Sequence, residues 1–154
     1  MRQDLVVAES VDIYKSAENV WNALTDPEII KKYLFGTETT TDWQVGSEII
    51  FQGFYGQNNE HSYRDKGVIL ENIPNKKLSY SYWSGFSGLE DKPENYSIVS
   101  YGLDSIENEK TTFTWKQQGY ATEENYLDSQ TGMQKFLEQL KEIIESKTGN
   151  ESTL

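Results

Sequence analysis

The sequence contains no cysteine, a single histidine and only 3 prolines. Without cysteine the chain can form neither a disulfide framework nor a thiolate site for catalysis or metal binding. No stretch approaches the roughly 20 apolar residues of a membrane-spanning helix, so membrane insertion is not expected. The first residues, MRQDLVVAES, lack the apolar core and cleavage site of a signal peptide. We therefore expect a cytoplasmic protein.

Basic residues are also scarce. The chain has 14 Lys and Arg against 25 Asp and Glu, which gives a formal net charge of −11. Nucleic acids and anionic membranes are bound through clustered Lys and Arg side chains that displace counterions from phosphates. The charge balance therefore excludes nucleic acid as an expected partner. We also expect a monomer or a weak dimer.

Aromatic residues, in contrast, are abundant, with 4 Trp, 10 Tyr and 6 Phe among 154 residues. Each ring can bury roughly 150–250 Å² of surface. The core is therefore expected to consist of few, large side chains, which leave gaps more readily than aliphatic ones. The length fits one domain, which we place at residues 1–148, followed by a flexible tail at 149–154.

Hydrophobic periodicity and turn residues predict the order of the elements. Ser16 and Asp26 are typical N-cap residues, and Pro27 suits the first turn of a helix. The expected strands are 5–14, the part of 43–56 that follows a turn at Val45-Gly46, 62–73, 76–85, 96–105 and 110–120. The expected helices are 17–24, 27–35 and 130–149, the last of which ends at Gly149.

The last predicted helix has one apolar stripe, and the strands have one apolar face. The helix stripe contains Met133, Phe136, Leu137, Leu140, Ile143 and Ile144 at helical spacing. Helices gathered on one side of an antiparallel sheet make an α+β fold. We expect a curved antiparallel sheet wrapped around the long C-terminal helix, with the two short helices after the first strand.

Several motifs in this order resemble a known family, the activators of the ninety-kilodalton heat-shock protein ATPase. The resemblance implies a START-like (SRPBCC) domain with the helix-grip, or Bet v-like, fold. Family members often have a second glycine where Ser47 stands and a Trp where Met133 stands. The motifs are VWNALTDPE (20–28), KKYL (31–34), VGSEI (45–49), GVILENIPNKKLSYSYW (67–83) and TTFTWKQQGY (111–120).

In such folds the two short helices close one end of the space between the sheet and the long helix. The resemblance thus implies that Trp21, Tyr33 and either Leu34 or Phe35 turn inward or lie at the rim of a pocket. The family is functionally broad, and it includes lipid and polyketide binders, cyclases and co-chaperones. A fold therefore does not identify a function.

No catalytic or metal-binding constellation is evident, and we expect no metal and no cofactor. His61 has no further His or Cys ligands to accompany it. The GFSG stretch at 85–88 lacks the spacing of a nucleophile elbow and is interpreted as a loop. Glu48, Glu71 and Arg64 lie on or beside predicted strands, where they either orient a ligand's polar end or face solvent.

The inward-facing aromatic residues are the strongest indication of function. They predict a pocket for a small hydrophobic or aromatic molecule, although an ordinary packed core fits the pattern equally well. One β-bulge would reverse the predicted faces. The candidate ligand-binding residues are Trp21, Tyr33, Phe51, Tyr82, Tyr101, Phe113, Trp115, Met133 and Phe136.

Three functions are compatible with this pattern. The first is non-enzymatic binding of the hydrophobic molecule. The second, which rests on the family resemblance alone, is interaction with a chaperone as an ATPase activator. The third is an enzyme of the cyclase or dehydratase type that acts on a polyketide-like substrate, in which Tyr82, Tyr101 or Arg64 would supply polar groups.

Overall fold

The fold is that of a computed structural model, which describes the backbone of residues 1–152 and the side chains of residues 1–146. Within this part of the chain seven strands form one antiparallel sheet in the order β1-β7-β6-β5-β4-β3-β2. The strands are β1 (Arg2–Ile13), β2 (Glu38–Thr40), β3 (Glu48–Tyr55), β4 (His61–Ile73), β5 (Lys77–Tyr82), β6 (Ser97–Glu107) and β7 (Lys110–Tyr120).

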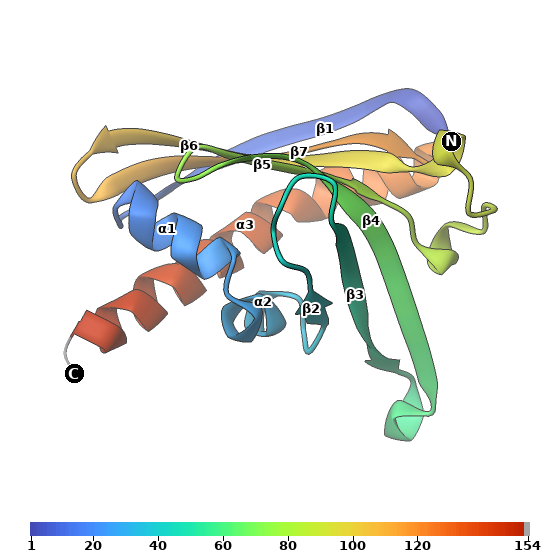
Figure 1. Ribbon diagram of the computed structural model, residues 1–154, viewed down its shortest axis with the longest axis horizontal. Helices are drawn as coiled ribbons and strands as arrows, with labels where there is room; N and C mark the ends of the chain where they lie inside the picture. The colour runs from blue at the N-terminus through green and yellow to red at the C-terminus, as the bar shows by residue number, and fades with distance from the viewer. Residues whose placement is uncertain (153–154) are drawn as a thin grey trace.

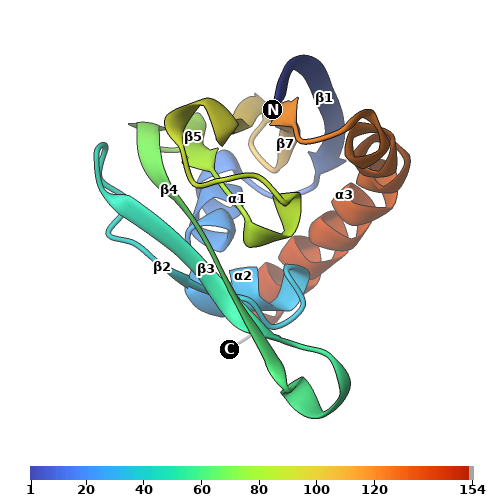
Figure 2. The same ribbon diagram turned by 90° about the vertical axis from the view of Figure 1, so that its right-hand side faces the viewer.

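The helices α1 (Ala17–Leu24), α2 (Pro27–Tyr33) and α3 (Glu123–Ser152) all lie on the same side of the curved sheet (Figure 1). The long helix α3 runs obliquely under the sheet and packs chiefly against β1. Figure 2 shows the sheet curling around the helices, with the β3–β4 hairpin extending beyond them. This arrangement confirms the α+β helix-grip fold.

Local sequence signals explain the two short helices. The Ser16 side chain accepts a hydrogen bond from the backbone N–H of Asn19 at 3.2 Å, and Asp26 accepts one from Glu28 at 2.9 Å. These caps satisfy N–H groups that would otherwise lack partners at the start of each helix. The predicted caps of α1 and α2 are thereby confirmed.

Strand alternation places large apolar side chains on the inner face of the sheet. On β1 the predicted inward residues Val7, Val11 and Ile13 are buried, and on β7 Phe113 is fully buried. The pairing of β4 with β5 shifts register between Ile69 and Glu71. The inner-face prediction nevertheless holds for the strands that carry the core.

Gly67 marks the place where β4 and β5 approach most closely. A Cβ atom at this position would overlap the backbone carbonyl of Ser81. Immediately beside it, the backbone groups of Lys66 and Trp83 exchange hydrogen bonds of 2.8 and 3.0 Å. Only glycine fits such a close approach of two backbones.

Several predicted boundaries were wrong. The short strand β2 was not predicted, whereas β3 begins at Glu48, directly after the predicted turn at Val45-Gly46. Helix α2 ends at Tyr33 rather than at 35, because Phe35 and Gly36 adopt positive φ values of 52° and 95°. A left-handed residue cannot continue a right-handed helix.

Helix α3 also differs from its predicted bounds. It begins at Glu123 rather than at 130, because the Thr122 hydroxyl accepts a hydrogen bond from the backbone N–H of Asn125 at 3.0 Å and caps the helix there. It passes the predicted stop at Gly149 and runs to Ser152. Residues 153–154 of the expected tail lie outside the described residues, and the mobility of 149–154 stays a prediction.

Candidate functional site: an aromatic cavity between sheet and helix

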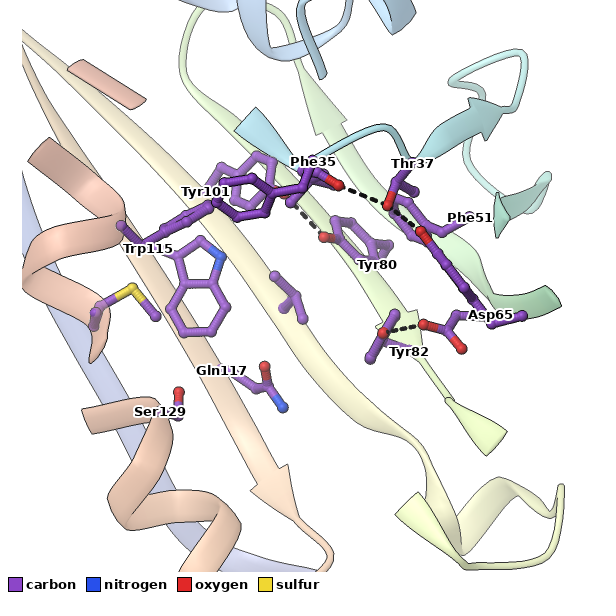
Figure 3. Close-up of a pocket in the computed structure, with 15 residues that line it drawn as sticks. Phe35, Thr37, Phe51, Asp65, Tyr80, Tyr82, Tyr101, Trp115, Gln117 and Ser129 are labelled. Carbon is purple, nitrogen blue, oxygen red and sulfur yellow. Dashed lines mark hydrogen bonds between the residues drawn. The ribbon is translucent and has the colours of Figure 1, made fainter. Parts of the chain in front are cut away.

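A cavity of about 380 Å³ lies between the inner face of the sheet and helix α3 (Figure 3). Its volume falls within the roughly 300–1,000 Å³ that is typical of small-molecule sites. Aromatic side chains make up most of its wall. The lining residues are Leu34, Phe35, Thr37, Phe51, Tyr63, Asp65, Tyr80, Tyr82, Val99, Tyr101, Trp115, Gln117, Ser129, Met133 and Phe136.

Six of the nine candidate ligand-binding residues lie on this wall. Strands β3, β5, β6 and β7 contribute one aromatic residue each, and α3 contributes two side chains from the opposite side. Their contact with a ligand stays a prediction. The six are Phe51, Tyr82, Tyr101, Trp115, Met133 and Phe136.

The other three candidates lie in the core beside the cavity rather than on its wall. Trp21 is buried on α1. Tyr33 packs edge-on against Phe136 at 6.2 Å between ring centroids, and Phe113 packs edge-on against Tyr101 at 5.5 Å. Tyr33 and Phe113 therefore support rings that line the cavity.

The polar side of the wall was not predicted. Arg64 was expected either to orient a ligand's polar end or to face solvent; it is exposed, and the neighbouring Asp65 is the residue that lines the cavity. Asp65 shares its face of β4 with the buried Gly67 and Ile69. The alternation of β4 therefore contained the signal that would have found Asp65.

The two other charged candidates also lie away from the cavity wall. Glu48 is exposed, and Glu71 forms an ion pair with Lys77 at 3.0 Å. Tyr80 was not among the candidates, although two-residue alternation along β5 places it on the same face as Tyr82. Both tyrosines line the cavity.

Most hydroxyl groups on the wall are bonded to one another or to neighbouring polar groups. The hydroxyls of Tyr80 and Tyr101 lie 2.9 Å apart and form a buried hydrogen bond. The hydroxyl of Tyr82 donates to Oδ2 of Asp65 at 2.5 Å. Figure 3 shows these two pairs at different places along the wall. The rings are thus fixed by polar tips as well as by packing.

Burial keeps the tyrosine hydroxyls protonated at neutral pH. Desolvation raises the pKa of Tyr80 well above its ordinary value, and the neighbouring Tyr101 adds to the effect. Desolvation likewise raises the pKa of Tyr82, with the negative charge of Asp65 and the hydrogen bond to it as further causes. These phenols act as hydrogen-bonding groups and not as phenolates.

Phe35 borders the cavity from the loop that follows α2, and 80% of the residue is exposed. A bulky residue with positive φ is uncommon, and such a conformation persists only where the surroundings hold it. The resemblance-based expectation that Leu34 or Phe35 lies at the rim agrees with this placement, since both line the cavity.

The remaining candidate groups lie elsewhere. His61 is exposed on β4, near Glu60, and its ring packs against Tyr55 at 5.1 Å. The GFSG stretch forms the 3-10 turn η2 (Gly85–Ser87). Among the described residues no three His, Asp or Glu side chains are grouped so that they could hold a metal ion. None of the helices in this part of the chain combines the length and the apolarity of a membrane span.

Comparison with known proteins identifies the family. Residues 15–145 match the family described as Activator of Hsp90 ATPase homolog 1-like protein. This chain belongs to that family. A solved structure of ChR145 from Cytophaga hutchinsonii is 34% identical to it, with a TM-score of 0.79 over 97% of this chain and 99% of that chain. No curated protein matches the sequence.

More distant Activator of Hsp90 ATPase homolog 1-like structures share the fold alone. The Aha1 dimer from Colwellia psychrerythraea is 22% identical, with a TM-score of 0.67 over 91% of this chain and 96% of that chain. An HSP90 activator from Plasmodium falciparum is 16% identical, with the same TM-score and the same coverage. In this member of the family Met133 lines the cavity.

Proposed function

We propose that the protein binds a small, largely apolar molecule in the cavity between the sheet and α3, without converting it. The observation that carries this proposal is the cavity of about 380 Å³ with its mainly aromatic wall. Pockets of this kind bury most of a ligand's surface, and a few fixed polar groups orient it. Here the polar groups are the bonded tyrosine tips and Asp65.

A substitution at Ser129 on α3 tests the proposal. Ser129 lines the cavity, and its hydroxyl lies 2.9 Å from that of Tyr120. Ser129→Trp should fill the space and abolish binding, whereas Ser129→Ala loses the same hydrogen bond but leaves the space open. Comparing these two variants separates blocked binding from lost stability.

The measurement is a fluorescence titration of the full chain with lipids, polyketides and flavonoids. Trp115 lines the cavity, so a bound molecule should change its emission, and Trp115→Phe should remove most of that change. Equal responses from Ser129→Trp and Ser129→Ala would place binding elsewhere. No response to any compound would refute the proposal.

A second candidate function, interaction with a chaperone of the Hsp90 class, is favoured by one observation. Exposed aromatic rings gather near the outer end of the projecting β3–β4 hairpin, where Phe86 packs edge-on against Tyr55 at 5.2 Å. Tyr55 and Phe86 are 44% and 63% exposed. Clustered exposed apolar residues mark interaction surfaces more often than single ones do.

An ATPase assay with the chaperone tests this second function. Stimulation that Tyr55→Ser and Phe86→Ser reduce, and that Ser129→Trp leaves intact, would support it. If the protein neither stimulates the chaperone's ATPase nor retains the chaperone in a pull-down, the second function is refuted. Cytoplasmic location and a monomeric or weakly dimeric state remain proposals, and light scattering of the purified protein tests the latter.

A further inference from the structure

Asp65 is a buried carboxylate that has no cationic partner among the described residues. It is 6% exposed. Its Oδ2 accepts the hydrogen bond from Tyr82, while Oδ1 is buried without a hydrogen-bond partner. The adjacent Lys66 pairs with Asp91 at 2.5 Å, and Arg64 is exposed. A buried charge is normally paired, because desolvation without a partner is costly.

The polar groups near Asp65 offer lone pairs rather than protons. The single hydroxyl proton of Tyr82 is committed to Asp65. Thr37 donates to the carbonyl of Leu34 at 2.8 Å, so the hydroxyl of Tyr63 must donate to Thr37. The phenolic oxygens of Tyr82 and Tyr63 are therefore left as acceptors.

Gln117 extends this pattern on β7. Its Nε2 donates to Ser97 Oγ at 3.3 Å and to the carbonyl of Gly119 at 3.2 Å, which leaves Oε1 as an acceptor. The indole N–H of Trp115 is a donor on the same strand (Figure 3). Among residues 1–146, whose side chains are described, no Lys, Arg or His lines the cavity.

We propose that the ligand is an apolar molecule with a protonated amine, which sits beside the Tyr82 oxygen and pairs with the Asp65 carboxylate. This inference rests on the proposed function and names the ligand's chemical class. The hydrocarbon or aryl part lies among the rings near Phe51 and Trp115. The ammonium group donates to the acceptors that the wall presents.

The negative charge of Asp65 favours an amine over a carboxylate or a hydroxyl as the ligand's polar group. A carboxylate ligand would bring a second negative charge into a cavity without a basic side chain. A hydroxyl would satisfy a lone pair but would leave the charge of Asp65 without a counter-charge. An ammonium group supplies both the donor and the counter-charge, in a charge-assisted hydrogen bond.

The rings and the overall charge favour the same ligand class. Phe51 and Tyr82 pack edge-on with centroids 5.9 Å apart, and both line the cavity, where ring faces attract cations. The net charge of −11 raises the encounter rate with a cation. Since Oδ1 is covered, the ammonium donates to the Tyr82 oxygen, and its charge is paired with the carboxylate across the hydrogen bond from Tyr82 to Oδ2.

Calorimetric titration of the full chain with three matched compounds tests the inference. The compounds are 1-naphthylmethylamine, 1-naphthylmethanol and 1-naphthylacetate, which share one aryl group and differ in charge. We expect the amine to bind about tenfold or more tightly than the alcohol, and the acid to bind weakest. This ranking needs no variant and therefore does not depend on a substitution folding correctly.

Two variants then assign the preference to Asp65. Asp65→Asn should weaken amine binding by about tenfold and change alcohol binding by less than about threefold. Asp104→Asn, which removes the same charge from an exposed position on β6, should leave all three affinities unchanged. An amine-to-alcohol affinity ratio that Asp65→Asn leaves unchanged would overturn the assignment.

The outcomes separate this inference from the proposed function. Equal binding of amine, alcohol and acid would overturn the inference and leave a hydrophobic binding site. Tighter binding of the acid would overturn it as well. Absence of binding by all three compounds, together with no response in the wider fluorescence panel, would overturn both.

Discussion

Replacing Tyr80 by phenylalanine removes one hydroxyl from a buried pair and leaves the other without a partner. The hydroxyls of Tyr80 and Tyr101 lie 2.9 Å apart, and the two residues are only 6% and 8% exposed. A buried polar group that loses its partner costs about 1–3 kcal/mol, whereas removing both partners is nearly neutral. Each single variant should therefore be less stable than the double variant Tyr80→Phe/Tyr101→Phe.

The expected magnitude follows from that asymmetry. Each single substitution should lower the free energy of unfolding by about 1–3 kcal/mol, whereas the double substitution should be nearly neutral, so the coupling should be close in size to the sum of the two single losses. For a chain of this length 1 kcal/mol corresponds to roughly 2–4 °C in Tm. Tyr14→Phe, at an exposed tyrosine, should change stability by less than about 0.5 kcal/mol.

Urea unfolding of the four proteins gives the cycle, provided that the m-value stays constant across the set. Additive effects with no coupling would refute the reasoning. They would mean that each hydroxyl finds its partner in water within the cavity. The cavity wall would then be wetter at this point than a site for an apolar molecule should be.

Three further predictions concern the fold, the buried phenols and the rim. Gly67→Ala should destabilise the protein by about 3 kcal/mol or more, because its Cβ would overlap the Ser81 carbonyl; calorimetry measures the loss. Burial raises the pKa of Tyr33, so the unfolded state loses the phenol proton at lower pH than the folded state does. The free energy of unfolding should therefore fall as pH rises above about 10, by up to about 1.4 kcal/mol per pH unit for this group. Urea unfolding between pH 8 and 11.5, in roughly half-unit steps, should show a smaller decline for Tyr33→Phe. Phe35→Asn should leave stability unchanged or raise it by up to about 1 kcal/mol, since Asn tolerates positive φ, and should speed ligand release in stopped-flow experiments.

Each of these three has a clear contrary result. Gly102→Ala is the control for Gly67, because its Cβ would meet only Thr114 at 4.0 Å, so equal losses at both positions would contradict the crowding argument. An unchanged alkaline slope in Tyr33→Phe would mean that the phenol titrates normally. A marked loss of stability in Phe35→Asn would show that the ring packs against the protein rather than bordering the cavity.

The sequence predicted the fold well because its signals were local and repeated. The caps at Ser16 and Asp26 and the alternation on β1 each needed only near neighbours to be interpreted. The site was predicted less well, because lining a cavity depends on which side of an inward ring faces empty space. Phe113 and Tyr101 are both buried on adjacent strands, yet only Tyr101 lines the cavity.

The polar end of the cavity follows from the same backbone feature that requires glycine. The hydrogen bonds between Lys66 and Trp83 join β4 to the end of β5, and Asp65 and Tyr82 lie on either side of this bridge. Their side chains consequently meet on the inner face, where the tyrosine donates to the carboxylate. A Cβ at Gly67 would push the two strands apart at this point. The close pairing of β4 and β5 at Gly67 therefore brings the Asp65 carboxylate and the Tyr82 phenol together. Any substitution that separates the two strands there should also reduce the preference for an amine ligand.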